Sequence, residues 1–133
     1  MRKAVVIGLV LMLMLAAGGT AASGSPTFTL KFVSATRADP PDQLLNIADF
    51  TVQLPKRKQD NIFYLVQLVT HCLDTNATRL GGLAWVGTNG QAVSISGSYE
   101  GAEGATCEAW VYNTAGKHPD PSKPASNVAP FPG

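Results

Sequence analysis

Apolar and polar positions alternate with a period of two along most of this chain. In residues 27–33, Phe28, Leu30 and Phe32 alternate with polar neighbours. This alternation is typical of strands that bury one face. The same pattern returns in three later segments, at 50–54, 93–99 and 106–113.

Residues 62–73 form the most apolar stretch beyond the N-terminal region. Both faces of this stretch are apolar at first, and β-branched and aromatic types are frequent, among them Phe63 and Val69. A strand covered on both sides fits this composition, and a buried helix is the alternative. The β-forming residues and the polar loop before the stretch favour a central strand. A shorter strand is predicted at 83–86, after the Gly81-Gly82 break.

Turn signals separate these segments. Residues 34–46 contain Pro40-Pro41 and several polar groups, which predicts a loop with a short helical turn around 43–47. Asn89-Gly90 is suited to a tight turn, and residues 100–105 are rich in glycine. Six or so short strands with little helix predict a mainly β fold, either a small antiparallel β-sandwich or a partly open barrel.

Residues 1–22 have the layout of a cleaved signal peptide. Arg2 and Lys3 precede an apolar run of about 14 residues, and small residues around Ala22 provide a peptidase site. A membrane anchor is the alternative, but a spanning helix needs about 20 apolar residues. No cysteine follows the run, which argues against a lipoprotein anchor. We therefore expect a secreted or periplasmic protein that is not inserted in a membrane after cleavage.

The rest of the chain divides into a domain at 25–116 and a tail at 117–133. The tail carries five prolines among glycine and polar residues, a composition that cannot continue the interior of a sheet. We expect this tail to be extended or disordered. It should contribute little to folding, because it has little apolar surface to bury.

The only two cysteines are Cys72 and Cys107. An even count in an exported chain favours a disulfide between them. In the chain-entropy model, closing a loop of this length stabilises the fold by roughly 3–4 kcal/mol. A metal pair would need further ligands, and only His71 is near. We therefore predict a disulfide and no metal site.

Charge excludes some partners. The formal net charge is +1, and it falls to about −1 when Arg2 and Lys3 are removed with the signal peptide. No bulk charge attracts nucleic acid or acidic lipid. The one charge run, Lys56-Arg57-Lys58, follows Pro55 and indicates a solvated turn. The glycosylation sequon Asn76-Ala77-Thr78 is informative only in a eukaryotic host.

The end of the strand pattern resembles a known family. Residues 107–116 (CEAWVYNTAG) followed by 119–124 (PDPSKP) are similar to the close of a fibronectin type III or immunoglobulin-like domain, and Cys72, Trp85 and Cys107 follow the immunoglobulin order. The resemblance implies a β-sandwich and no particular site. The chain departs from the family in the short interval between Trp85 and Cys107, and in lacking a tyrosine two residues before Cys107.

No residue set predicts catalysis or a cofactor. The only histidines are His71 and His118, and a hydroxyl nucleophile needs a positioned base. A cysteine held in a disulfide is not a nucleophile. The remaining candidates are three carboxylates near one turn, which have neither the partners of a glycosidase pair nor a calcium-loop spacing: Glu100, Glu103 and Glu108. A small hydrolase is the least favoured class.

Four residues are candidate binding residues. Alternate positions of a strand share a face, so Trp110 and Tyr112 point away from Cys107. Phe63 and His71 likewise point away from Cys72. The resulting outer face is more apolar than a monomer usually exposes. It is either covered by the 34–46 loop or the proline tail, or it forms a partner surface.

These observations favour a non-catalytic binding module for a protein or a glycan. The first alternative is a structural subunit of a surface assembly that self-associates. The second is a small exported hydrolase inhibitor that presents a loop at 38–43 or 100–105.

Overall fold

A computed structural model describes residues 27–58 and 61–133. The expected signal peptide and its cleavage site lie outside the described residues. The described chain forms strands and loops, with no helix long and apolar enough to cross a membrane. In order, the strands are β1 (Thr29–Thr36), β2 (Ile47–Gln53), β3 (Phe63–Cys72), β4 (Ala77–Gly87), β5 (Val93–Ser98), β6 (Thr106–Asn113) and β7 (Ala129–Pro132).

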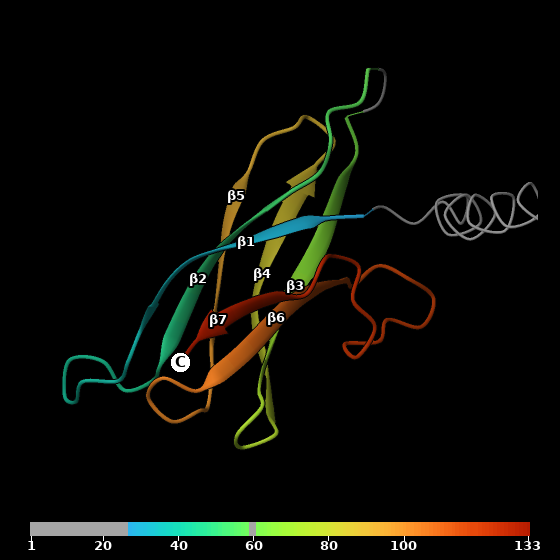
Figure 1. Cartoon of the computed structure of the whole chain (residues 1–133). Coiled ribbons are helices and arrows are strands. Elements are labelled where there is room, and N and C mark those ends of the chain that lie inside the picture. The colour runs from blue at the N-terminus through green and yellow to red at the C-terminus, as the bar shows by residue number, and fades with distance from the viewer. Residues whose placement is uncertain (1–26, 59–60) are drawn as a thin grey trace, which may run out of the picture.

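The strands form two antiparallel sheets, as Figure 1 shows. One sheet has the order β1-β2-β5 and the other has the order β4-β3-β6-β7. The predicted mainly β, antiparallel fold is confirmed. The predicted central strand at 62–73 is confirmed as well, because β3 lies between β4 and β6.

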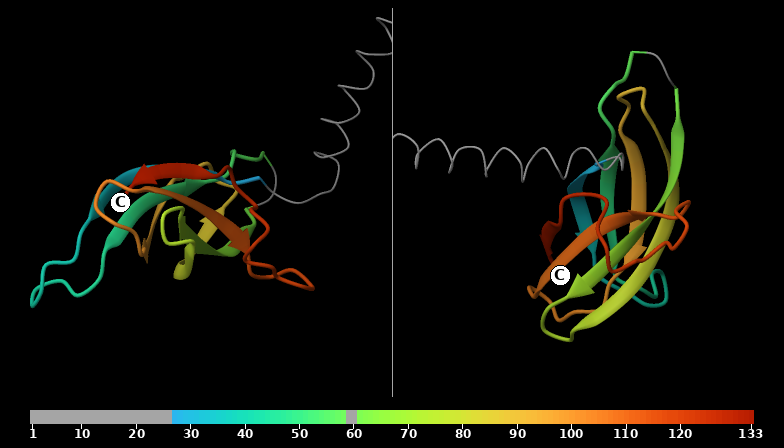
Figure 2. Two further views of the ribbon diagram at one scale, coloured as in Figure 1. Left: turned by 60° about the horizontal axis from the view of Figure 1, so that its bottom comes forward. Right: turned by 90° about the vertical axis from the view of Figure 1, so that its right-hand side faces the viewer.

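The two sheets approach each other closely at both edges, which gives the curved shape in Figure 2. A Cβ on Gly81 of β4 would lie 2.9 Å from the Cα of Gly97 of β5, so the backbones nearly touch there. At the other edge, the Asn127 side chain accepts from the Leu30 amide at 2.8 Å and donates to the Leu30 carbonyl at 3.0 Å. An amide side chain thus takes the place of a ladder pair between β1 and the C-terminal segment.

The core is filled by inward-facing side chains of both sheets. Alternating residues of β1, β2 and β3 are buried, including Leu30, Phe50, Val66 and Leu68. An aromatic cluster made of Phe32, Phe50, Tyr99 and Phe131 fills one end of the core. These contacts hold the two sheets together.

The predicted disulfide is confirmed between Cys72 and Cys107. The two residues are register partners on the neighbouring strands β3 and β6. The bridge therefore links strands within one sheet, whereas the immunoglobulin bridge joins two sheets. Trp85 does not pack on the bridge as the immunoglobulin tryptophan does, because its side chain is exposed.

The expectation that the tail contributes little to folding needs correction. Its last residues form β7, which pairs with β6 from Thr106↔Pro132 to Ala109↔Ala129. Phe131 points into the core and is buried. Only its last residues are extended, since the Lys123 amide donates to the Asp120 carbonyl at 3.0 Å and closes a turn. The packed domain therefore continues beyond Gly116.

Two local expectations are also corrected. The residues around 43–47 form no helical turn. Instead, the backbone groups of Asp39 and Gln43 bond each other at 2.8 and 3.0 Å, which closes a hairpin that projects at the lower left of Figure 1. The strand expected at 83–86 is longer, because β4 continues through Gly81 and Gly82.

Candidate functional site: the outer face of the four-stranded sheet

The register of the sheet decides which side chains share its outer face. Cys72 and Cys107 are buried and face the core. Pairing of β3 with β6 sets Val69 opposite Trp110 and Gln67 opposite Tyr112. The alternation of side chains then places these residues on the outer face.

All four candidate binding residues lie on this outer face. His71 is opposite Glu108 on β6, and Phe63 is opposite Gly87 on β4. The face has two halves with different surroundings. His71, Trp110 and Tyr112 belong to a half covered by the tail, which we call the covered half. Phe63 belongs to a half that the described chain leaves open.

The proline tail, rather than the 34–46 loop, covers Trp110. The indole Nε1 donates to the Pro121 carbonyl at 2.7 Å. Tyr112 is buried, and its hydroxyl donates to Gln67 Oε1 at 2.6 Å. The Gln67 Nε2 donates onward to the Gly81 carbonyl at 2.9 Å. The polar ends of both aromatics are thus occupied within the fold.

A cleft of about 480 Å³ lies between the covered half and the tail, and His71 lines it. Its Nε2 is 2.7 Å from Asn76 Oδ1, and its Nδ1 is 3.5 Å from Glu108 Oε2. On the opposite wall, the Ser122 hydroxyl donates to Asp120 at 2.7 Å. Hydrogen bonds from the hydroxyl and the amide of Ser122 lower the pKa of Asp120.

This cleft does not have the geometry of a hydrolase site. Both ring nitrogens of His71 face other side chains, and the Ser122 hydroxyl bonds to Asp120. The hydroxyl and the imidazole are therefore not arranged as nucleophile and base. Cys72, which adjoins the histidine, is held in the disulfide.

The three carboxylates near the 100–105 turn do not converge. Glu108 faces His71, and Glu100 lies 3.4 Å from Arg79. Glu103 is exposed in the turn itself. Among the described residues there is no group of three or more His, Cys, Asp or Glu side chains that would suit a metal ion.

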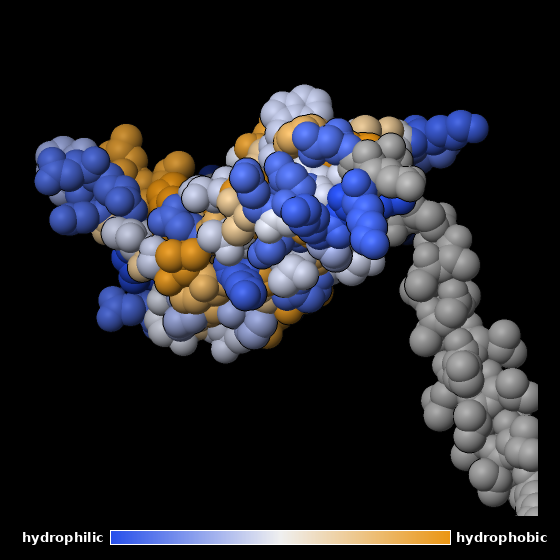
Figure 3. Space-filling model, turned by 90° about the horizontal axis from the view of Figure 1, so that it is seen from above, coloured by the Kyte–Doolittle hydropathy of each residue, from blue (hydrophilic) through white to orange (hydrophobic). Residues whose placement is uncertain are grey.

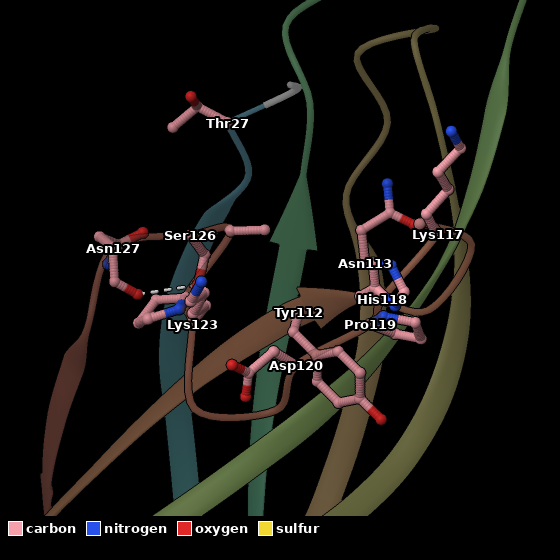
Figure 4. A pocket seen from close by; sticks show the side chains of 13 residues that line it. Thr27, Tyr112, Asn113, Lys117, His118, Pro119, Asp120, Lys123, Ser126 and Asn127 are labelled. Atoms are coloured by element: carbon pink, nitrogen blue, oxygen red, sulfur yellow. Dashed lines mark hydrogen bonds between the residues drawn. The ribbon is translucent and has the colours of Figure 1, made fainter. Parts of the chain in front are cut away.

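A second hollow of about 660 Å³ lies between the tail and the end of β6. Figure 4 shows its labelled side chains, with Thr27 and Lys117 on opposite sides and the ring of Tyr112 beneath. Lys117, Lys123 and Asp120 line it together with His118, so its rim carries charges of both signs. The rim side chains come from the exposed loop rather than from the sheet.

The open half of the face is strongly apolar. Its members are large hydrophobic side chains on β3 and β4 that are each between 49% and 60% exposed: Phe63, Leu80, Leu83 and Trp85. The Phe63 ring packs against Gly87, where an added Cβ would come within 2.6 Å of it. We call these four residues the open face.

A bulge in β4 explains how the open face forms. Leu80 and Leu83 are three positions apart, so an unbroken strand would send them to opposite faces. The pairing shifts between Gln67↔Leu83 and Val69↔Leu80, which leaves one extra residue at Gly81-Gly82. Both leucines therefore face outward. Sequence reasoning missed Leu80, Leu83 and Trp85, although a glycine pair within a strand pattern is a bulge signal.

Comparisons with protein-family models, with curated proteins and with solved structures give no match for this chain.

Proposed function

We propose that this chain is a secreted or periplasmic, non-catalytic binding module that docks a protein partner on its open face. The observation that carries the proposal is the grouping of Phe63, Leu80, Leu83 and Trp85, all exposed, on one side of one sheet. Contiguous exposed apolar patches of this kind mark interaction sites in soluble proteins. The disulfide supports an oxidising location.

The composition of the open face favours a protein partner over a glycan. Aromatic rings serve both kinds of partner, since they offer large area at little cost in side-chain entropy. A sugar also brings hydroxyl groups that need polar partners, and buried hydroxyls without partners are costly. Leu80 and Leu83 offer none. Apolar side chains of a protein suit this surface better.

Site-specific photo-crosslinking tests the proposal. Trp85 is replaced by p-benzoylphenylalanine, and the protein is irradiated in the cells that produce it. We expect protein adducts of discrete mass from this position. The matched control is the same replacement at Ser94, which is exposed on β5 of the other sheet.

Equal adduct yields at the two positions would contradict a protein-docking role for the open face. A glycan-binding face would give a different result, in which soluble oligosaccharides protect Trp85 from modification and no protein adduct forms.

A further inference from the structure

We infer that the partner is a second copy of this chain, and that the contact joins two different surfaces. The projecting hairpin of one molecule, residues 37–46, would seat Leu44 and Leu45 against the open face of the next. This inference rests on the proposed function, because it names the partner of the same face.

The hairpin exposes two leucines on an ordered support. Leu44 is 74% exposed and Leu45 is 50% exposed. The Gln43 Nε2 donates to the Leu45 carbonyl at 2.8 Å and to the Thr36 carbonyl at 3.1 Å. At the base of the hairpin, Asn46 Oδ1 accepts from the Ala38 amide at 2.7 Å. Side-chain bonds thus hold the hairpin in shape before binding, which lowers the entropy lost on contact.

The space-filling view from above shows apolar side chains beside the charged tip of this hairpin, at the left of the molecule (Figure 3). The leucines stand out from the body of the protein, so they suit an apolar surface on another molecule. The open face offers an apolar surface of matching chemistry.

Charge next to the two apolar surfaces is complementary. The hairpin carries Asp39 and Asp42, both exposed. The exposed run Lys56-Arg57-Lys58 lies next to the end of the open face, since the Arg57 amide donates to the Thr88 carbonyl at 2.8 Å and the Thr88 amide to the Ile62 carbonyl at 2.9 Å. Oppositely charged rims steer association and fix its register. The run at 56–58, which the sequence indicated to be a solvated turn, would thus face the acidic hairpin of the neighbouring copy.

The two surfaces lie in different parts of one molecule, so a molecule cannot satisfy both by itself. In Figure 1 the hairpin is at the lower left, and the loop between β2 and β3 that bears the basic run is at the top. When a hairpin docks on the open face of another copy, the pair still has one free hairpin and one free open face. Further copies can add to these, which builds rings or open chains. We therefore expect oligomers that grow with concentration rather than a closed dimer.

The combined apolar area of the two surfaces determines how tightly two copies should bind. An aromatic side chain buries about 150–250 Å² in full, and these six side chains are each 49–74% exposed, so together they supply on the order of 600 Å² of apolar area. Stable interfaces bury about 1,200–2,000 Å² in total. The contact should therefore be weak, with dissociation at micromolar concentrations or above.

Sedimentation velocity of the exported protein, with variants of each surface, tests the inference. Leu44→Asp removes the hairpin contact and Leu83→Asp removes the open-face contact, and both positions are exposed enough to keep the fold. We expect the unmodified protein to form oligomers beyond a dimer as its concentration rises, and each variant to stay monomeric. An equimolar mixture of the two variants should form a one-to-one dimer, because each retains the surface that the other lacks.

A charge exchange provides a second test. The double variant Lys56→Glu, Lys58→Glu should no longer form oligomers. Adding Asp39→Lys and Asp42→Lys to the same chain should restore oligomer formation. Raising salt should weaken association of the unmodified protein severalfold, because exposed charges are screened over about 10 Å at 0.1 M.

Three results would overturn the inference: a monomer at all concentrations up to about 1 mM, where even weak contacts are populated, oligomers that persist in both single variants, or no dimer in the mixture. A monomer whose Trp85 position still crosslinks to other proteins would leave the proposed function intact. A monomer whose Trp85 position gives no adduct above the Ser94 control would contradict both the self-association and the proposed function.

Discussion

The ring of Phe131 stacks on the ring of Phe32, with centroids 5.5 Å apart and an interplanar angle of 17°. One residue belongs to the last strand and the other to the first, so this contact joins the two ends of the described chain. Phe131 also meets Phe50 and Tyr99 edge-on, at 5.5 and 5.3 Å. The C-terminal segment is therefore part of the core.

Phe131→Ala should destabilise the fold by about 3–5 kcal/mol, as truncation of a buried aromatic does. The matched control is Pro130→Ala, since Pro130 is exposed on the other side of β7. Denaturant unfolding followed by circular dichroism measures both. Similar stabilities for the two variants would show that the tail does not pack as described.

The two tryptophans should differ sharply in their contribution to stability. Trp110 lies beneath the tail and bonds to Pro121, whereas Trp85 stands on the open face. Trp110→Ala should cost about 2 kcal/mol, roughly half of the value for a fully buried ring. Trp85→Ala should cost under about 1 kcal/mol, as exposed positions do. Equilibrium unfolding in urea compares them, and equal losses would contradict the division into covered and open halves.

The close approach of β4 and β5 should make Gly81 intolerant of a side chain. A Cβ there would lie 2.9 Å from the Cα of Gly97, and backbone atoms cannot move away as a flexible side chain can. Gly81→Ala should cost about 1–3 kcal/mol from overpacking. Gly116→Ala is the control, because nothing lies within 4 Å of its Cβ position. A thermal melt that leaves both variants unchanged would show that the sheets do not meet at this point.

Local composition was enough to predict the central strand, the cysteine count was enough to predict the disulfide, and alternation gave the outward direction of Trp110, Tyr112, Phe63 and His71. Each of these features depends on the local pattern of residue types or on very few residue pairs. The inward direction of Cys72 and Cys107 fixes the outward direction of Trp110 and Tyr112 on a regular strand, and β6 has no register shift against β3.

Two features depended on tertiary packing, and the sequence did not reveal them. The proline-rich end forms a strand because β7 is at the edge of its sheet, where prolines are tolerated. Its alternation of Ala129 and Phe131 with two prolines was the available signal. The open face depended on a bulge at Gly81-Gly82, which moves Leu80 to the side of Leu83. Counting alternate positions assumes a regular strand, so it assigns the residues on one side of a bulge to the wrong face.

Iodide quenching of Trp85 measures whether the open face is accessible in the monomer and covered in the oligomer. The protein has two tryptophans, so Trp110→Phe leaves Trp85 as the only one. At dilute concentration, we expect its emission to resemble that of a solvated indole and to be strongly quenched. Quenching should then fall as protein concentration rises and a partner copy covers the open face. A blue-shifted emission that iodide does not quench in the dilute monomer would show that Trp85 is buried and that the open face is not available for docking.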